Sequence, residues 1–118
     1  MSDEFIKIAT NEINDDISQM ERILESCIND ETIKLNAEKF QKHTHKIKGL
    51  APMMGKEELG SISALLDEIF KKFIQGEHFD GIFEVLLATI PAMKDSVMDA
   101  KYDLDSITNQ VKNILSKQ

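Results

Sequence analysis

The sequence predicts an all-α fold, with four helices in an antiparallel up-down bundle and an accessory fifth helix. Three observations carry this prediction. The 118 residues include only two prolines and five glycines, while apolar residues make up 42% of the chain. The apolar positions recur every three or four residues, which is the spacing of one helix face. The breaks between these periodic segments are short, and short connections place consecutive helices antiparallel.

One domain is expected over residues 1–118, with the bundle at about 3–100 and the accessory helix at about 103–116. The length fits a single domain with one core of packed helices. The chain contains no internal repeat and no low-complexity linker that would divide it.

The first helix is predicted over residues 3–28, and Ser2 or Asp3 can cap its start. Asn29 and Asp30 mark the break after it. The second helix is predicted to begin near Glu31–Leu35 and to run to about Ala51. The apolar positions of these two helices are Phe5, Ile6, Ala9, Ile13, Ile17, Met20, Leu24 and Cys27, then Leu35, Phe40, Thr44, Ile47, Ala51 and Met54.

Proline and glycine punctuate the rest of the second helix. Pro52 lacks the backbone N–H, so the helix must kink or end there. Gly55 is the expected C-terminal cap. A third helix is predicted over about 56–75, and Gly76 ends it. Its apolar positions are Leu59, Ile62, Leu66, Ile69 and Phe73.

The fourth helix is predicted over about 80–100, with Asp80 as its N-cap and a kink at Pro91. Two helices split at Pro91 are the alternative. The fifth helix, at about 103–116, is more polar and is expected to pack on the outside of the others. The apolar positions here are Phe83, Leu86, Leu87, Ile90, Met93 and Val97, then Leu104, Ile107, Val111, Ile114 and Leu115.

The formal net charge of −7 argues against a nucleic-acid partner, because attraction to phosphate supplies most non-specific affinity. The charge is uneven: residues 34–49 hold five lysines and one glutamate. Such a basic patch on an acidic body suggests that one spot handles an anion or an acidic partner. A solvated helix face with lysines is the alternative reading.

Cys27 is the only cysteine, so no disulfide can form within the chain. This favours a reducing, cytoplasmic location, and the position of Cys27 in the apolar pattern predicts a small core residue. The sequence contains no long apolar run and no signal-peptide pattern, so neither a membrane span nor secretion is predicted.

Residues 43–49 read His-Thr-His-Lys-Ile-Lys-Gly and are predicted to hold the functional centre. At about 100° per residue, His45 points away from the core position Ile47, while His43 lies nearer the core and is expected to be a half-buried packing residue. Gly49 costs about 1 kcal/mol relative to alanine in a helix. It leaves space beside His45 for a second protein, or it loosens the helix ahead of Pro52.

The third helix offers a partner for His45. If it pairs with the second helix, Asp67 can accept the Nδ1–H of His45 and leave Nε2 free to attack phosphorus. Lys48, one turn from His45, can balance the charge of the transferred phosphoryl group. The residues around this centre form the predicted partner-docking strip, which consists of Gln41, Lys42, Gly49, Gly60, Ser63 and Ala64.

The motif His45-x-Ile47-Lys48-Gly49 resembles the phospho-accepting signature of histidine phosphotransfer (HPt) domains. The resemblance is closest to the amino-terminal phosphotransfer domain of chemotaxis histidine kinases. It covers about the first hundred residues, including the run from His45 through Ile69 and the Leu35-Asn36-Ala37 stretch. The chain departs from that family at Asp67, where a glutamate is frequent, at Ala64, where chemotaxis members often have histidine, and at Leu50 and Pro52.

The resemblance implies a role in a two-component phosphorelay. His45 would accept a phosphoryl group and exchange it with an aspartate of a response-regulator receiver domain. A histidine kinase catalytic domain, in the same or another chain, would be the second partner. The domain itself would bind no cofactor, and the Mg²⁺ needed for the aspartate half-reaction would come with the receiver.

Three functions other than phosphotransfer make different demands on the sequence. His43 and His45 lie about 200° apart on a helix, so they cannot share one metal ion. The sequence has no Gly-rich phosphate loop, so the chain is expected to be a phosphohistidine carrier without its own ATP site, and part of a kinase only if linked to a separate kinase domain. A non-catalytic helical-bundle interaction module is the alternative that remains.

Overall fold

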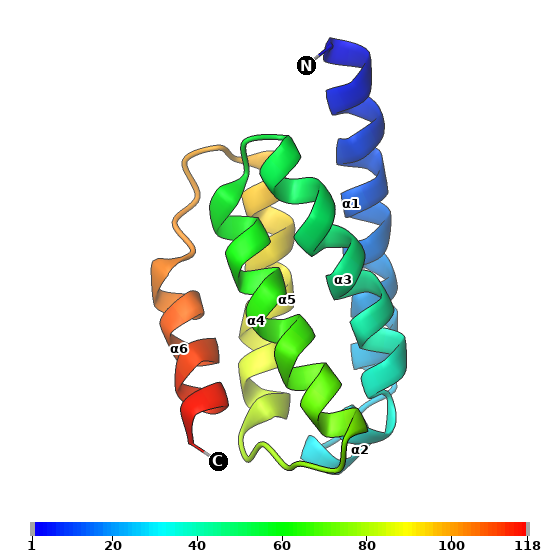
Figure 1. Ribbon diagram of the computed structural model, residues 1–118, viewed down its shortest axis with the longest axis vertical. Coiled ribbons are helices and arrows are strands. Elements are labelled where there is room, and N and C mark those ends of the chain that lie inside the picture. Colours follow the sequence, from blue (N-terminus) through cyan, green and yellow to red (C-terminus); the bar gives the residue numbers. More distant parts are fainter. Residues whose placement is uncertain (1, 118) are drawn as a thin grey trace.

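The computed structural model describes residues 2–117, and every regular element in this range is a helix, as the sequence predicts (Figure 1). Short turns join the helices. Their bounds are α1 Asp3–Glu25, α2 Asp30–Leu35, α3 Ala37–Met53, α4 Glu57–Ile74, α5 Ile82–Met98 and α6 Asp105–Ser116.

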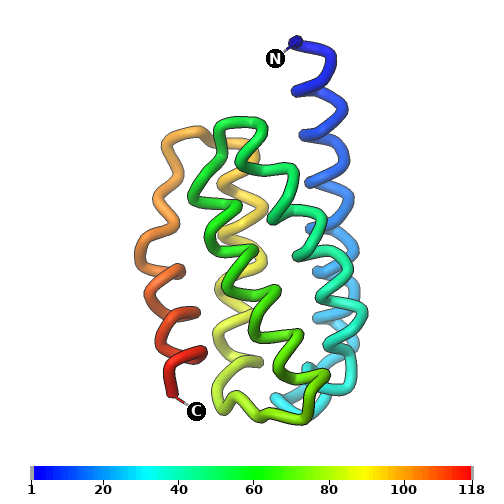
Figure 2. The backbone as a smooth tube through the Cα atoms, in the orientation of Figure 1, coloured from blue at the N-terminus to red at the C-terminus, as the bar shows by residue number. Residues whose placement is uncertain are grey.

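The four long helices α1, α3, α4 and α5 lie alongside one another, and α6 lies outside them against α4 and α5 (Figure 1). The first turns of α1 extend beyond the ends of the neighbouring helices (Figure 2). Over residues 2–117, none of the helices combines the length and the apolar character needed to cross a bilayer. The most extensive interface between two helices is that of α3 with α4. These two helices therefore position the side chains that lie between them.

The core is built from the apolar faces that the helical spacing indicates. Ile13, Ile47 and Ile69 are completely buried. Phe40 of α3 stacks on Phe70 of α4, with ring centroids 5.0 Å apart and an angle of 9° between the planes. This pair joins the first turn of α3 to the last turns of α4, one turn before the histidine-containing segment.

The second predicted helix is in fact two helices, α2 and α3, which meet at Asn36. The side-chain amide of Asn36 donates to the carbonyl of Thr32 at 2.8 Å. Asparagine competes in this way for backbone hydrogen bonds and so favours a helix boundary. Leu35, the last residue of the short helix α2, was predicted to face the core, but it is 76% exposed.

The predicted start of the fourth helix is also wrong, because α5 begins at Ile82 and Asp80 lies exposed in the preceding turn. The cap comes from α2 instead. The carboxylate of Asp30 accepts hydrogen bonds from the backbone N–H groups of Gly81 and Phe83 at 2.9 and 2.8 Å. These are donors at the first turn that no carbonyl of the helix itself can satisfy.

Other boundaries agree with the prediction or shift by a few residues. Ser2 caps α1 by accepting the N–H of Phe5 at 3.1 Å, but α1 ends at Glu25 rather than at residue 28. Gly55 and Gly76 follow α3 and α4 with positive φ angles of 77° and 100°, as expected of helix-ending glycines.

The two prolines lie inside helices. Pro91 is part of the single helix α5, so a split into two helices at this residue is wrong. Pro52 occupies the last turn of α3, which ends at Met53. Leu87, one turn before Pro91, is 46% exposed and does not belong to the core face on which the apolar spacing placed it.

Candidate functional site

One face of α3 presents three polar side chains to a single carboxylate of α4. Gln41, His45 and Lys48 are four and three residues apart, so they lie in one row along the helix. Each has a polar atom near Asp67, whose side chain is only 2% exposed. The structure therefore brings together the three residues that the sequence predicted as catalytic, and it adds Gln41 to them.

The two oxygens of Asp67 have different neighbours. Gln41 Nε2 donates to Oδ1 at 2.8 Å. His45 Nδ1 lies 3.5 Å from Oδ2, and Lys48 Nζ lies 3.7 Å from the same atom. The contact with Gln41 has the length of a normal hydrogen bond, whereas the other two are longer than the usual 2.7–3.2 Å range. The contact with Lys48 is an ion pair, and the contact with His45 is a long approach of Nδ1 to the carboxylate.

His45 is open to solvent, since its side chain is 64% exposed. Its Nδ1 faces the carboxylate, which favours the tautomer with the proton on Nδ1 and a lone pair on Nε2. The side chain of Lys48 is 46% exposed and can reach a group bound to the ring as well as Asp67. The arrangement can thus support a nucleophilic imidazole nitrogen with a buried anion behind it and a mobile cation beside it.

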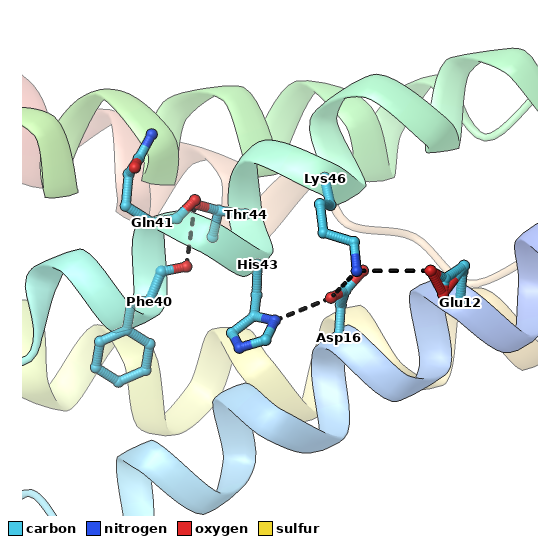
Figure 3. A network of polar contacts seen from close by, with 7 residues as sticks. All are labelled: Glu12, Asp16, Phe40, Gln41, His43, Thr44 and Lys46. Atoms are coloured by element: carbon cyan, nitrogen blue, oxygen red, sulfur yellow. Dashed lines mark hydrogen bonds and ion pairs between the residues drawn. The ribbon is translucent and has the colours of Figure 1, made fainter.

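The opposite side of α3 carries a second polar cluster that the sequence analysis missed (Figure 3). His43 Nδ1 lies 2.9 Å from Asp16 Oδ1, and the His43 side chain is 14% exposed, in agreement with the predicted half-burial. Lys46 Nζ lies 3.1 Å from the same oxygen and 3.6 Å from Glu12 of α1. His43 therefore joins α3 to α1 through a charged contact and not through packing alone.

A sequence signal for this cluster exists in α1. Asp16 lies directly before Ile17, and it follows Ile13 by three residues, so it falls on the buried edge of an apolar face. A carboxylate at such a position requires a cation or donor from the neighbouring helix. Asp16 is indeed 1% exposed, yet both of its partners contact Oδ1, and Oδ2 is buried without a hydrogen bond.

The contact with Asp16 has a consequence at high pH. The hydrogen bond to Asp16 raises the pKa of Lys46 above its ordinary value of 10.5. A pKa that is higher in the folded state means that the ammonium group stabilises the fold fully below the unfolded-state pKa, and that this contribution is lost as the pH rises through the folded-state pKa.

We therefore expect wild type to be more stable than Lys46→Met by a constant margin between neutral pH and pH 10.5 and by a shrinking margin above it. Urea unfolding of both proteins across this range measures the margin, and Lys39→Met, a change at another exposed lysine of α3, serves as the control. A margin that stays constant through the alkaline range would show that Asp16 does not hold the Lys46 proton.

Two residues of the predicted docking strip are buried. Ser63 is completely buried, so the prediction that it contacts a second protein is wrong. Gly60 is also buried, and a Cβ added to this residue would meet the ring of Pro52. Both errors have one cause: the rotation of α4 about its axis turns this part of the strip towards α3, which helical spacing alone does not reveal.

The other members of the strip remain at the surface. Lys42 and Gly49 are exposed, and no atom lies within 4 Å of the place where a Cβ of Gly49 would stand. Ala64 is partly exposed. A shallow groove is lined by Lys48 of the Asp67 cluster and by Pro52, Glu57, Gly60, Ser61 and Ala64.

Within residues 2–117, the side chains that could jointly hold a metal ion are Glu58, Asp103 and Asp105. All three are exposed carboxylates, and none belongs to the cluster around Asp67.

No protein-family model, no curated protein and no solved structure matches this chain.

Proposed function

We propose that this chain is a histidine phosphotransfer domain, in which His45 accepts a phosphoryl group and exchanges it with an aspartate of a response-regulator receiver domain. One observation carries the proposal. The exposed imidazole of His45 has its Nδ1 3.5 Å from a carboxylate that is 2% exposed, with Lys48 on the same oxygen. An exposed nucleophile with a carboxylate behind it and a cation beside it suits phosphoryl transfer to histidine.

In the transfer, the lone pair of His45 Nε2 attacks the phosphorus of the receiver's aspartyl phosphate. The P–N bond forms while the P–O bond to the aspartyl carboxylate breaks, and that carboxylate leaves with the bonding electrons. The Nδ1 proton stays on the ring, so the phosphorylated imidazole becomes cationic. Asp67 balances this positive charge, and Lys48 can turn from Asp67 to the phosphoryl oxygens.

The proposal includes the arrangement of the helices and the partners. The helices α1, α3, α4 and α5 would form an antiparallel up-down bundle with α6 as the accessory helix, which their short connections support. A histidine kinase catalytic domain, in this or another chain, would supply the phosphoryl group from ATP, and the receiver would bring Mg²⁺. The proposed setting is the cytoplasm, where such a kinase and receiver meet, and the exposed residues Lys42 and Gly49 would contact the receiver.

Phosphorylation by receiver domains tests the proposal. A panel of receiver domains is charged with acetyl phosphate and Mg²⁺, separated from the reagent and mixed with the chain. We expect phosphate that is labile to acid and stable to alkali, located on His45 by mass spectrometry. A His45→Gln variant should lose it completely, and His78→Gln, which changes an exposed histidine outside the site, should retain it.

Two results would contradict the proposal. The first is labelling that is equal in wild type and His45→Gln, because the phosphate would then be attached elsewhere. The second is stable binding of a charged receiver without any transfer, which would instead support a non-catalytic interaction module.

A further inference from the structure

We propose that Gln41 is a positioning residue, which fixes the orientation of the Asp67 carboxylate and thereby the position of the ring proton on His45. The effect of Gln41 on the transfer rate depends on the proposed function. Its effect on the His45 tautomer does not, so the two can be measured separately.

The hydrogen bond between Gln41 and Asp67 is the short contact of the cluster. Gln41 Nε2 lies 2.8 Å from Asp67 Oδ1, against 3.5 and 3.7 Å for the contacts of Oδ2 with His45 and Lys48. An ionised carboxylate only accepts hydrogen bonds, so the amide must present its N–H to it. Oδ1 is thus occupied by a donor, and Oδ2 is left to the histidine and the lysine.

The side chain of Asp67 needs such a restraint because its carboxylate can turn about a soft torsion with a broad, two-fold preference. A rotation would carry Oδ2 away from His45. Nδ1 and Oδ2 are already 3.5 Å apart, which is beyond the usual length of a hydrogen bond. Gln41 and His45 are four residues apart on the same helix face. The amide therefore fixes the carboxylate relative to the helix that carries the histidine.

In the cluster on the other side of α3, the carboxylate has no amide partner. His43 and Lys46 repeat the His-x-x-Lys spacing of His45 and Lys48, and they face Asp16 as the other pair faces Asp67. There, histidine and lysine share Oδ1, and Oδ2 has no hydrogen bond. The division of one carboxylate between an amide and a histidine is thus specific to the exposed site.

The substitution Gln41→Met tests the proposal, because methionine keeps the length of the side chain and the helix propensity but cannot donate. In ¹⁵N spectra of the histidine rings, we expect the His45 signals to shift from the Nδ1–H towards the Nε2–H tautomer. The single-turnover rate of phosphoryl transfer from a charged receiver should fall about tenfold, as for the loss of one hydrogen bond to a charged group. The receiver concentration at half-maximal rate should stay unchanged.

Two further variants separate positioning from a structural role. Gln110→Met makes the same substitution at an exposed position of α6 outside the cluster, and it should change neither the spectra nor the rate. In an Asp67→Asn background, Gln41→Met should cause little additional loss, because Gln41 acts through the carboxylate.

An unchanged His45 tautomer in Gln41→Met would overturn the proposal, and so would a rate loss of the same size in the Asp67→Asn background. A tautomer shift in a protein that no receiver phosphorylates would leave the positioning role intact and reject the phosphotransfer function. The spectra and the transfer assay therefore fail independently.

Discussion

Asparagine in place of Asp67 is expected to lower the rate of phosphoryl transfer to His45 by about 100-fold. Replacement of a buried, histidine-orienting aspartate by asparagine costs about 10⁴-fold in the serine protease triad. The effect should be smaller here, because His45 is 64% exposed and its Nδ1 lies 3.5 Å from Oδ2. The side-chain volume hardly changes, so the loss reports the missing negative charge behind the ring together with the altered tautomer of His45.

Rapid-quench measurement of single turnovers with a charged receiver gives this rate. Asp16→Asn is the matched control, since it makes the same change at the other buried aspartate that faces a histidine of α3. It should leave the transfer rate close to that of wild type. Equal rates for Asp67→Asn and wild type would mean that the carboxylate plays no part in the reaction.

Two glycine-to-alanine substitutions should change stability in opposite directions. In a helix interior, alanine is favoured over glycine by about 1 kcal/mol. At Gly49, a Cβ would meet no atom within 4 Å, so Gly49→Ala should raise the free energy of unfolding by up to about this amount. At Gly60, a Cβ would stand 2.7 Å from Cγ and 2.9 Å from Cδ of Pro52.

A proline ring cannot turn aside as a flexible side chain can, so Gly60→Ala must push α3 and α4 apart. Overpacking of this kind costs about 1–3 kcal/mol, which outweighs the gain in helix propensity. Urea unfolding measures the two changes in the free energy of unfolding, provided that its dependence on urea concentration has the same slope in both variants. If Gly60→Ala stabilised the protein as much as Gly49→Ala, the close approach of Gly60 to Pro52 would be absent in solution.

The helices and the pairing of His45 with Asp67 follow from the sequence because both depend on spacing along a helix. The period of the apolar residues fixes which face of α3 is buried, and it leaves His45 on the outside. The contact with Asp67 also requires that α3 and α4 be neighbours, which their short connection predicts, and that α4 turn Asp67 towards α3.

The remaining features depend on quantities that spacing does not contain. The burial of Ser63 follows from the rotation of α4 about its own axis, and the hydrogen bond of Gln41 follows from the rotamer of one side chain. The boundary at Asn36 arises from a competition between a side-chain amide and the backbone. The apolar periodicity continues across that boundary and therefore conceals it.

The capping of α5 by Asp30 couples two segments that are 51 residues apart in the chain. A helix of six residues such as α2 is not stable by itself, so it persists only while it is docked. When α2 detaches, the amides of Gly81 and Phe83 lose their acceptor as well. The short helix and the first turn of α5 should therefore open and close as one cooperative unit, at the end of the molecule opposite the turn between α3 and α4 (Figure 1), while the contacts of His45 and Asp67 stay in place.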